Sequence, residues 1–346
     1  MSGTSLDGVD IAFCKFSFKK NKPSFSIEAS KTFRYSDHWK SKLSEAHLLS
    51  GEELMQFHSG YGKFLGQLCN QFIEKNEIRN VDLIASHGHT VFHQPDNKFT
   101  FQLGNGNEIH AATQLPVAFD FRSMDVALGG EGAPLVPVGD KFLFSEYDVC
   151  LNLGGIANLS IDVKGERKAF DICFCNLALN HLASKAGKDF DAGGKLASIG
   201  SVNERLLNSL DIIYSRNQKK KPSLGREGFE KQIQALLDDE SIPLNDRLRT
   251  VCESITNEIS FAIPYARKRT KLLVTGGGAH NKFLIELIQQ KLQEKTKIIV
   301  PDKTIVNFKE ALVFAFLGVL RLRNEINVLK SVTGASRNSC SGVLIG

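Results

Sequence analysis

Apolar side chains alternate in part along the first segment of the chain, as they do in β-strands that bury one face. Between residues 10 and 18 they fall at Ile11, Phe13, Phe16 and Phe18. A polar turn at 19–23 follows, and residues 24–33 return to an extended pattern. We therefore expect a β-hairpin near the start of the chain.

The next segment has the period of a helix. Residues 43–78 carry an apolar stripe at spacings of three and four, formed by Leu54, Phe57, Tyr61, Phe64, Leu65, Leu68 and Phe72. Such a stripe is the buried face of a helix rather than a cofactor site. Beyond it, short apolar runs predict strands at 81–85, 99–103 and 116–121, with a short helix at 108–114.

The second half repeats the arrangement of strand, glycine turn and strand. A strand-like segment at 147–153 leads into Gly154-Gly155-Ile156-Ala157-Asn158, and residues 159–163 form another. Further strands are expected at 169–172, 271–275 and 297–300, and helices at 176–186, 246–266 and 308–324. Strands that alternate with helices predict an α/β fold. At 346 residues the chain is long for one core, so we expect two domains, with a boundary close to Leu128.

Composition and charge narrow the class of protein. Hydrophobic residues make up 42% of the chain and charged residues 23%, as in ordinary soluble globular proteins. A net charge of +5, spread along the sequence, gives little support to nucleic-acid binding. No apolar run approaches the ~20 residues of a membrane span, and no secretory signal is expected. Seven cysteines, an odd number without framework spacing, indicate reduced thiols and a cytoplasmic protein.

The first candidate site is the stretch Met1-Ser2-Gly3-Thr4-Ser5-Leu6-Asp7-Gly8-Val9-Asp10. Gly3 and Gly8 allow tight turns and bring backbone N–H groups close to an anion. The hydroxyls of Thr4 and Ser5 add donors, and Asp7 and Asp10 could hold a hydrated Mg²⁺ between phosphate oxygens. No Gly-Lys-Ser/Thr follows, so this is not a Walker loop. A glycine-rich hairpin loop without a ligand is the structural alternative.

Other polar and glycine-rich positions follow predicted strands. Gly276, Gly277 and Gly278 end a strand before a helix, which suits the phosphates or ribose of a nucleotide. Asp171 ends another strand, where an α/β domain places a catalytic acid or base, although a helix cap fits equally well. His87, His89 and His93 could be metal ligands, solvated loop residues or parts of a cleft wall. The glycines at 129–132 could line a cleft or form a linker.

As a string, MSGTSLDGVD is similar to the opening signature of the anhydro-N-acetylmuramic acid kinases, within the larger group of sugar kinases, actins and 70-kDa heat-shock proteins. The resemblance continues in order along nearly the whole chain, through 86–90, 120–137, 151–158, 275–281, 308–311 and 333–335. It implies two actin-like (ribonuclease H-like) α/β domains, residues 1–128 and 129–346, each with a mixed sheet, and a nucleotide in the cleft between them.

The resemblance also implies roles for single residues. Asp171 matches the general base, and Glu310 matches a sugar-site residue that assists catalysis, although an acid in the first turn of a helix is its structural alternative. Residues 3–10 and the group Gly154, Gly155 and Asn158 match the two phosphate loops, and Gly276 to Gly278 match the adenosine element. The residues expected near the sugar are His87, His93, Arg122, Asp125 and Asn176. ATP and Mg²⁺ are the implied cofactors, with Asp7 and Asp10 at the metal.

The implied reaction opens 1,6-anhydro-N-acetylmuramic acid with water and phosphorylates O6, in peptidoglycan recycling. The implied partners are ATP and an amino sugar, with no nucleic acid or membrane, and a homodimer fits the family. Two alternatives stay open: a kinase for another amino sugar, and an actin- or heat-shock-like ATP switch that phosphorylates nothing.

This chain departs from the family pattern at three places. Cys173-Phe174-Cys175 replaces the usual Gly-Pro-Gly before Asn176, which puts close approach of the backbone to the sugar in doubt. We expect these cysteines to be buried thiols rather than a metal or redox pair. His89 stands where the family usually has Gln. The signature normally follows a short apolar strand, so we expect the start of the first strand to be missing ahead of Met1.

Overall fold

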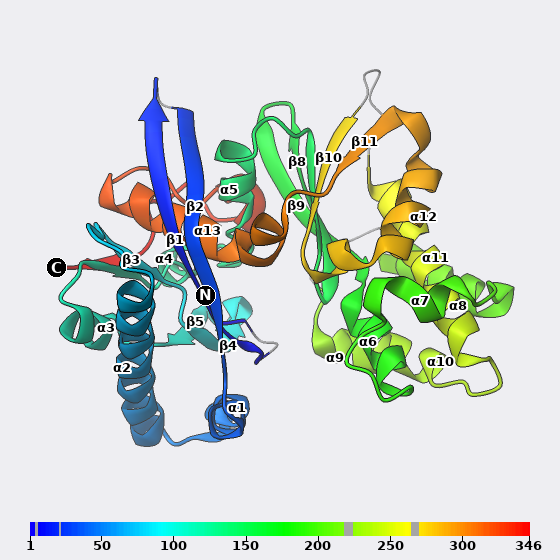
Figure 1. The fold of residues 1–346 in the computed structure, drawn as a ribbon, viewed down its shortest axis with the longest axis horizontal. Helices are drawn as coiled ribbons and strands as arrows, with labels where there is room; N and C mark the ends of the chain where they lie inside the picture. Colours follow the sequence, from blue (N-terminus) through cyan, green and yellow to red (C-terminus); the bar gives the residue numbers. More distant parts are fainter. Residues whose placement is uncertain (4–5, 21, 218–223, 264–269) are drawn as a thin grey trace. The chain divides into compact units, whose positions relative to one another are not determined.

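The computed structural model describes residues 1–346 except 4–5, 21, 218–223 and 264–269. The chain forms two compact units (Figure 1). Unit 1 comprises Met1–Phe144 and Phe308–Gly346, and unit 2 comprises Ser145–Asn307. The division therefore differs from the one expected at Leu128, because residues 129–144 and the C-terminal segment pack with the N-terminal part of the chain.

The first hairpin forms as predicted. Strands β1 (Gly8–Lys19) and β2 (Lys22–Arg34) pair antiparallel, with a bulge opposite Phe13 and Cys14. No strand begins at Met1 among the described residues, where Ser2 makes only an isolated bridge to Val9. The expectation of a missing first strand thus stays a prediction.

The long helix expected at 43–78 is divided. Helix α1 (Asp37–Ser44), a 3₁₀ turn (Ala46–Leu48) and α2 (Gly51–Lys75) replace it. Ser50 accepts a hydrogen bond from the Glu53 N–H, and the Glu53 carboxylate bonds back to Ser50. This capping box begins a new helix at Gly51. The apolar stripe of α2 contributes to the core, as predicted.

The described residues of unit 1 form three small sheets. Strands β3 (Ile84–Ser86), β6 (Val117–Phe119) and β12 (Val343–Ile345) form one in the order β12-β6-β3, and β4 (His89–Gln94) pairs with β5 (Phe99–Leu103). The pair β1-β2 is the third. The unit's other helical elements are a 3₁₀ turn (Pro95–Asn97), α3 (Gly106–Thr113), α4 (Ser123–Ala127), α5 (Pro137–Phe142) and α14 (Lys330–Thr333).

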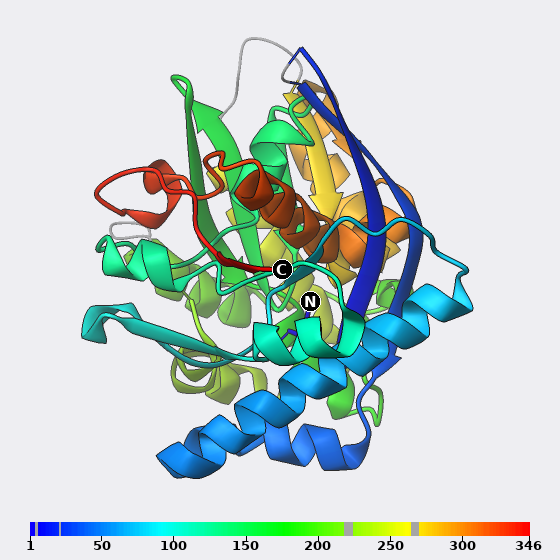
Figure 2. The ribbon, with the colours of Figure 1, turned by 90° about the vertical axis from the view of Figure 1, so that its left-hand side faces the viewer.

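Helices cover the two faces of the strands in unit 1. Leu83 and Ala85 pack in the cluster of α13 (Lys303–Leu322), whereas Ile84 packs in the cluster of α2 and α3. Figure 2 shows α2 across the front of this unit. Gly66 lets α2 and α3 approach closely, since a Cβ there would lie 2.6 Å from Cβ of Ala112.

Unit 2 is built on one mixed sheet. Strands β7 (Val149–Leu153), β8 (Ile156–Val163), β9 (Glu166–Phe174), β10 (Thr270–Thr275) and β11 (Thr296–Ile299) lie in the order β11-β10-β7-β8-β9. The pairs that involve β10 are parallel, and β8 is antiparallel to both neighbours. The strand–glycine–strand motif predicted at 147–163 is therefore the β7–β8 hairpin, and the α/β class with mixed sheets is confirmed.

Helices α6 (Asn176–Ser184), α11 (Leu244–Ala262) and α12 (Lys282–Leu292) pack beside this sheet (Figure 1). Helix α11 ends at Ala262, and Pro264, expected inside that helix, lies outside the described residues. The other helical elements of unit 2 are 192–194, α7 (Lys195–Ser198), α8 (Glu204–Asn217), α9 (Arg226–Phe229), a π-helical turn (Glu230–Gln234), α10 (Ala235–Leu237), 277–280 and 293–295. None of the helices within the described ranges is long and apolar enough to cross a membrane.

A buried ion pair fastens α13 to α5 in unit 1. Nζ of Lys309 lies 2.7 Å from Oδ1 of Asp140, and the two side chains are only 6% and 4% exposed. The Lys309 ammonium also lies 5.3 Å from the ring centroid of Phe144. Because the loss of one partner takes a counter-ion away from a buried charge, the pair is costly to break from one side.

We predict that Lys309→Met lowers the free energy of unfolding by about 3–5 kcal/mol. The double variant Lys309→Met/Asp140→Leu should recover most of this loss, since neither charge then remains. Urea unfolding followed by circular dichroism measures both. The matched control is Lys15→Met, because the Lys15–Glu28 pair is exposed and should contribute little to stability. Equal losses in the single and double variants would contradict the prediction.

Candidate active site

A row of polar residues crosses the sheet of unit 2. Asn152 on β7 lies opposite Asn158 on β8, and Asn158 lies opposite Asp171 on β9. Residues directly opposite one another share a face of the sheet, so these side chains form one polar stripe. The sequence predicted Asn158 and Asp171 as site residues. It missed Asn152, whose only signal was a polar residue inside the apolar run Val149–Leu153.

The sequence predicted that Asp171 ends its strand. The structure instead places Asp171 within β9, which continues to Phe174. The register of β8 and β9 shifts next to it, so that Ile172 is a bulge residue. Bulges re-aim side chains and are frequent beside active sites. Oδ2 of Asp171 accepts a hydrogen bond from the Leu224 N–H at 2.8 Å. Burial raises the pKa of Asp171, and the hydrogen bond from Leu224 opposes part of the rise. The net rise brings the pKa of the carboxylate closer to the range of a general base.

Asn176 joins the β7–β8 turn to the start of α6. Its Nδ2 donates to the carbonyl of Leu153 at 2.9 Å, and its N–H donates to the carbonyl of Gly154 at 3.1 Å. The carbonyl of Gly155 accepts from the N–H groups of Cys175 and Leu177. The structure therefore brings together Gly154, Gly155 and Asn176, which the sequence had assigned to separate elements.

The cysteines that replace the usual glycines are buried thiols, as predicted. Cys173 and Cys175 are free and fully buried, and both pack in the core of unit 2 around Phe174. Burial raises the pKa of Cys175 to about 12, so its thiol stays protonated. Neither residue is poised as a metal ligand or nucleophile.

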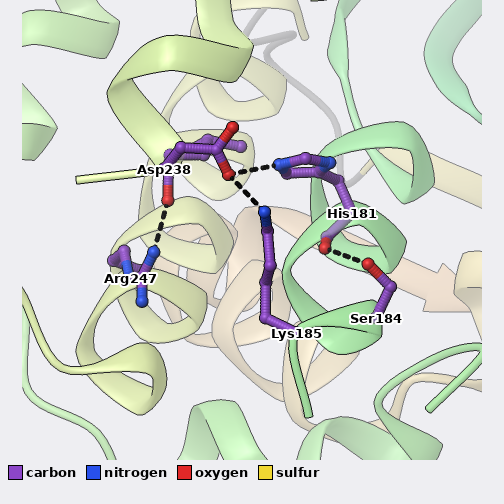
Figure 3. A network of polar contacts seen from close by, with 6 residues as sticks. His181, Ser184, Lys185, Asp238 and Arg247 are labelled. Atoms are coloured by element: carbon purple, nitrogen blue, oxygen red, sulfur yellow. Dashed lines mark hydrogen bonds and ion pairs between the residues drawn. The ribbon is translucent and has the colours of Figure 1, made fainter. Parts of the chain in front are cut away.

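The far end of α6 is held by a polar network that the sequence did not indicate (Figure 3). The Asp238 carboxylate lies 2.8 Å from Nε2 of His181 and 2.9 Å from Nζ of Lys185. Burial acts to raise the pKa of Asp238, but the hydrogen bonds from Lys185 and His181 outweigh it and the pKa falls. Arg247 of α11 donates to the carbonyl of Leu237 at 2.7 Å. The helix that presents Asn176 is thus fixed at both ends.

The three glycines after β10 differ in what the fold requires of them. A Cβ at Gly276, where φ is +83°, would lie 2.5 Å from Oδ1 of Asn152, and one at Gly278 would lie 2.7 Å from Cβ of Leu153. A Cβ at Gly277 would meet only Nδ2 of Asn176, at 3.5 Å, which is ordinary contact. The fold thus needs glycine at Gly276 and Gly278, whereas Gly277 leaves open a small space beside Asn176. Such a cradle fits close approach of a nucleotide.

The N-terminal segment of unit 1 folds back on β1. Met1 and Asp10 exchange two backbone hydrogen bonds, of 2.7 and 2.8 Å, and Leu6 N–H donates to the carbonyl of Gly3 at 3.4 Å. Thr4 and Ser5, expected to contact phosphates, lie outside the described residues. Gly8 packs so closely on β2 that a Cβ would lie 2.3 Å from the carbonyl oxygen of Phe33.

Asp7 and Asp10 lie close enough for their charges to interact. Burial raises the pKa of Asp10, the hydrogen bond from Oγ1 of Thr32 lowers it, and the charge of Asp7 raises it. Two nearby carboxylates fit Mg²⁺, which is held by one or two carboxylates together with waters and substrate phosphates. No group of three or more His, Cys, Asp or Glu side chains that could hold a metal occurs in the described part of the chain.

Arg122 and His87 form the central contact of the polar site in unit 1. Nε and Nη2 of Arg122 lie 3.1 and 2.9 Å from Nε2 of His87, and Nη1 donates to the carbonyl of Gly132 at 2.7 Å. Because a guanidinium can only donate, Nε2 of His87 accepts and its Nδ1, 3.0 Å from the carbonyl of Gly88, carries the proton. Burial and then Arg122 hold the pKa of His87 well below its usual value, so the ring is neutral.

Glu310 belongs to the same charged group. Crowding by protein atoms raises the pKa of its carboxyl, while Arg122 acts in the opposite direction and Asp10 adds to the rise. The side chain nevertheless keeps contact with solvent. Burial lowers the pKa of Arg122 to about 10, and Glu310 opposes that fall. Unit 1 therefore brings together three residues predicted at the sugar or phosphate: Glu310, Arg122 and His87.

Asp125 and His93 make other contacts. Asp125 is fully buried, with Oδ2 accepting from the Gly132 N–H and Oδ1 from Oγ1 of Thr333, each at 2.8 Å. Both oxygens thus fasten the glycine loop at 129–132 to the C-terminal segment. His93 lies on β4, with Nδ1 at 3.2 Å from Oγ1 of Thr100. Direct contact of either residue with substrate stays a prediction.

His89 takes part in a buried network near the N-terminus that the sequence did not indicate. Its Nδ1 lies 3.1 Å from Oγ of Ser2, which lies 2.7 Å from Oη of Tyr35, and Tyr35 bonds to Tyr61. Burial lowers the pKa of His89 to about 4. The folded protein therefore resists protonation of this ring.

We predict that stability falls as the pH drops from about 6.5, where an unfolded histidine titrates, toward 4. A depressed folded pKa gives stability that is complete above the unfolded pKa and is lost below it. His89→Gln should remove part of this loss, up to about 3 kcal/mol. Urea unfolding at pH 7.5, 6, 5 and 4.5 tests this, with His47→Gln, on an exposed residue, as the control. Parallel pH profiles for the His89 variant and the original chain would contradict it.

The chain matches known proteins along its whole length. The profile of the anhydro-N-acetylmuramic acid kinase (AnmK) family matches residues 1–346. The chain is 32% identical to the anhydro-N-acetylmuramic acid kinase of Sulfurimonas denitrificans, over 99% of this chain and 97% of that protein. The same enzyme from Sulfurovum sp. is 34% identical, over 99% and 96%. That from Vibrio vulnificus is 33% identical, over 99% and 96%.

Proposed function

We propose that this chain, which belongs to the anhydro-N-acetylmuramic acid kinase family and is a sugar kinase, opens 1,6-anhydro-N-acetylmuramic acid with water and phosphorylates O6 with ATP. The products are N-acetylmuramic acid 6-phosphate and ADP. The observation that carries this proposal is Asp171, a carboxylate of raised pKa at a strand bulge, in one polar group with Asn158 and Asn152.

Asp171 acts as the general base in the proposed reaction. Its carboxylate takes a proton from water, the water oxygen bonds to the anomeric carbon, and the bond from that carbon to O6 breaks. O6 then bonds to the γ-phosphorus of ATP as the bond to the β-γ bridging oxygen breaks. A base with raised pKa is effective because it is ionised near neutral pH and still binds a proton readily.

The other residues position the reactants. The β7–β8 turn with Gly154 and Gly155 and the segment at residues 3–10 bind phosphates, and the cradle at Gly277 takes the nucleoside side of ATP. Glu310, with Arg122 and His87, binds the sugar. Asp7 and Asp10 would hold Mg²⁺, which would supply neutralisation of phosphate charge. Phosphoryl transfer depends mainly on such positioning and charge neutralisation.

The setting of the reaction is part of the proposal. None of the seven cysteines, all of which the structure describes, is in a disulfide, which fits a reducing compartment, and we assign the protein to the cytoplasm and to peptidoglycan recycling. The whole-chain matches to enzymes of one name favour this kinase over an ATP-driven switch. The replaced segment Cys173–Cys175 keeps a second amino sugar in consideration, and a comparison of sugars distinguishes the two.

We predict that Asp171→Asn lowers sugar-dependent ADP release by about 10²–10⁴-fold, because the variant cannot take the proton from water. The Tm should stay the same or rise. The Asn amide oxygen can still accept the hydrogen bond from the Leu224 N–H, and a neutral amide costs less to bury than a carboxylate. In the original chain the rate should rise with pH through the raised pKa of Asp171. The assay is ADP release with and without the anhydro sugar, with the product followed by ³¹P NMR.

The control is Asp148→Asn. Asp148 accepts one backbone hydrogen bond, from the Lys271 N–H at 2.7 Å, as Asp171 does from Leu224, and it lies outside the polar row. That variant should keep its activity. Full turnover by Asp171→Asn would exclude this residue as the base, and ADP release independent of any sugar would favour the switch.

We predict that Gly277→Ala weakens ADP binding about tenfold or more but leaves the protein at least as stable. The added methyl fills the cradle, whereas the loss of unfolded-state freedom adds about 0.4–1 kcal/mol of stability. Gly276→Ala is the contrasting variant and should lower Tm, because φ is +83° and the methyl meets Asn152. Isothermal titration with ADP and thermal unfolding measure both. Unchanged ADP affinity in Gly277→Ala would remove this glycine from the nucleotide site.

A further inference from the structure

One segment of unit 2, residues 224–238, is attached at its start to Asp171 and at its end to α6. The Leu224 N–H donates to Oδ2 of Asp171 at 2.8 Å. At the other end the Asp238 carboxylate lies 2.8 Å from Nε2 of His181, on α6. The path of the residues between these two ends therefore decides where the Leu224 N–H lies relative to the carboxylate of Asp171.

The middle of the 224–238 segment is a helix that changes its period. Helix α9 leads directly into the π turn at Glu230–Gln234, and α10 follows. Residues four apart drift round an α-helix, and a wider π turn offsets this drift. Phe229, Ile233 and Leu237, which are four apart, are all buried. The π turn thus keeps Phe229 on the buried face of the segment.

The ring of Phe229 contacts two aromatic rings from other elements. Its centroid lies 5.7 Å from that of Phe174, with an angle of 71° between the ring planes. It also lies 5.7 Å from the centroid of His181, at 67°. Edge-to-face pairs of this kind are favourable beyond the apolar area that they bury. Phe229 therefore attaches the 224–238 segment to β9 as well as to α6.

Phe174 is the fixed side of this contact. Its side chain is fully buried, and its N–H donates to Oη of Tyr214 at 3.2 Å. The N–H of the next residue, Cys175, donates to the carbonyl of Gly155 at 2.9 Å. Phe174 stands where the family pattern has proline, which offers neither an aromatic ring nor an N–H. This chain therefore holds the 224–238 segment by a contact that the usual residue could not make.

We propose that Phe174 is a positioning residue for Asp171, and that it acts through Phe229 to hold the Leu224 N–H on the carboxylate. Because Asp171 is the base of the proposed function, this role rests on that function. Burial raises the pKa of Asp171 and the Leu224 bond opposes the rise, and within the described ranges the shift has no other cause. Asn158, directly opposite on β8, is neutral. Loss of the Leu224 bond should therefore move the ionisation of Asp171 to higher pH.

The first test compares Phe174→Leu, Phe229→Leu and the double variant. Each leucine keeps an apolar side chain in the core but removes the contact between the two aromatic rings. Either single change should move the acidic midpoint of the pH profile of kcat/KM upward by about half a unit or more, because the base loses a hydrogen-bond donor. The double variant should move it no further than the larger single change, since one contact can be lost only once.

The matched control is Phe283→Leu. Phe283 packs on the same core cluster, but its ring contacts the guanidinium of Arg249, 5.2 Å from the centroid. This variant should lower Tm and leave the pH midpoint unchanged. A purely structural effect of losing an aromatic ring would instead lower Tm in all the ring variants and shift the midpoint in none.

Hydrogen exchange at the Leu224 amide measures the same contact without any turnover. Exchange should be about fivefold faster or more in Phe174→Leu and Phe229→Leu, and unchanged in Phe283→Leu. Leu224→Pro removes the donor itself and should move the pH midpoint upward, whereas Leu224→Ala keeps the N–H and should not. Phe229→Leu carries the test if Phe174→Leu does not fold, because both variants break one contact.

Unchanged exchange at the Leu224 amide in the ring variants would overturn the positioning role. So would a pH midpoint that moves in Leu224→Pro but in neither ring variant, since the donor would then not need the rings. Full activity of Asp171→Asn would instead reject the proposed base, and exchange at Leu224 would still report whether Phe174 holds the segment.

Discussion

The carboxyl end of β7 is the point on which the candidate site of unit 2 depends. The carbonyl of Leu153 accepts from Asn176, so the start of α6 is fixed there, and the glycines at 276 and 278 pack on Asn152 and Leu153. Segments separated by more than a hundred residues are thereby held at one place. A change at any of these contacts would move the β7–β8 turn, the start of α6 and the loop after β10 together.

In unit 1 the corresponding constraint is the attachment of the C-terminal segment. Asp125 binds Thr333, Lys309 pairs with Asp140, and β12 adds to β6. In the first contact a buried carboxylate accepts a hydrogen bond, and in the second two buried charges pair. Loss of either partner would leave a buried polar or charged group with one partner fewer. The glycine loop at 129–132 and Glu310 on α13 therefore have fixed positions relative to Arg122. The position of Glu310 therefore depends on contacts within the protein, such as the ion pair of Lys309 with Asp140.

The sequence predicted the elements better than their limits and partners. Periodicity was sufficient for the β1–β2 hairpin, the β7–β8 hairpin and the α2 stripe, because each pattern is local. It failed at Ser50, where a capping box interrupts an apolar period, and at Asp171, where a bulge rather than a strand end presents the carboxylate. The domain limits and the role of Asn152 depend on contacts between distant segments, such as β12 with β6, and no local pattern contains that information.

The raised pKa values of Asp171 and Glu310 have the same physical origin, but the groups beside the two carboxyls differ in charge. Crowding by protein raises both, but Asp171 is opposed only by a neutral N–H, whereas Glu310 is opposed by the cation of Arg122. A charge partner holds a carboxylate ionised and fixes its orientation, which suits a residue that binds hydroxyl groups. A carboxylate without a cation gains more from accepting a proton, which suits a base. This difference between their surroundings supports the proposed roles, which are proton transfer for Asp171 and sugar binding for Glu310.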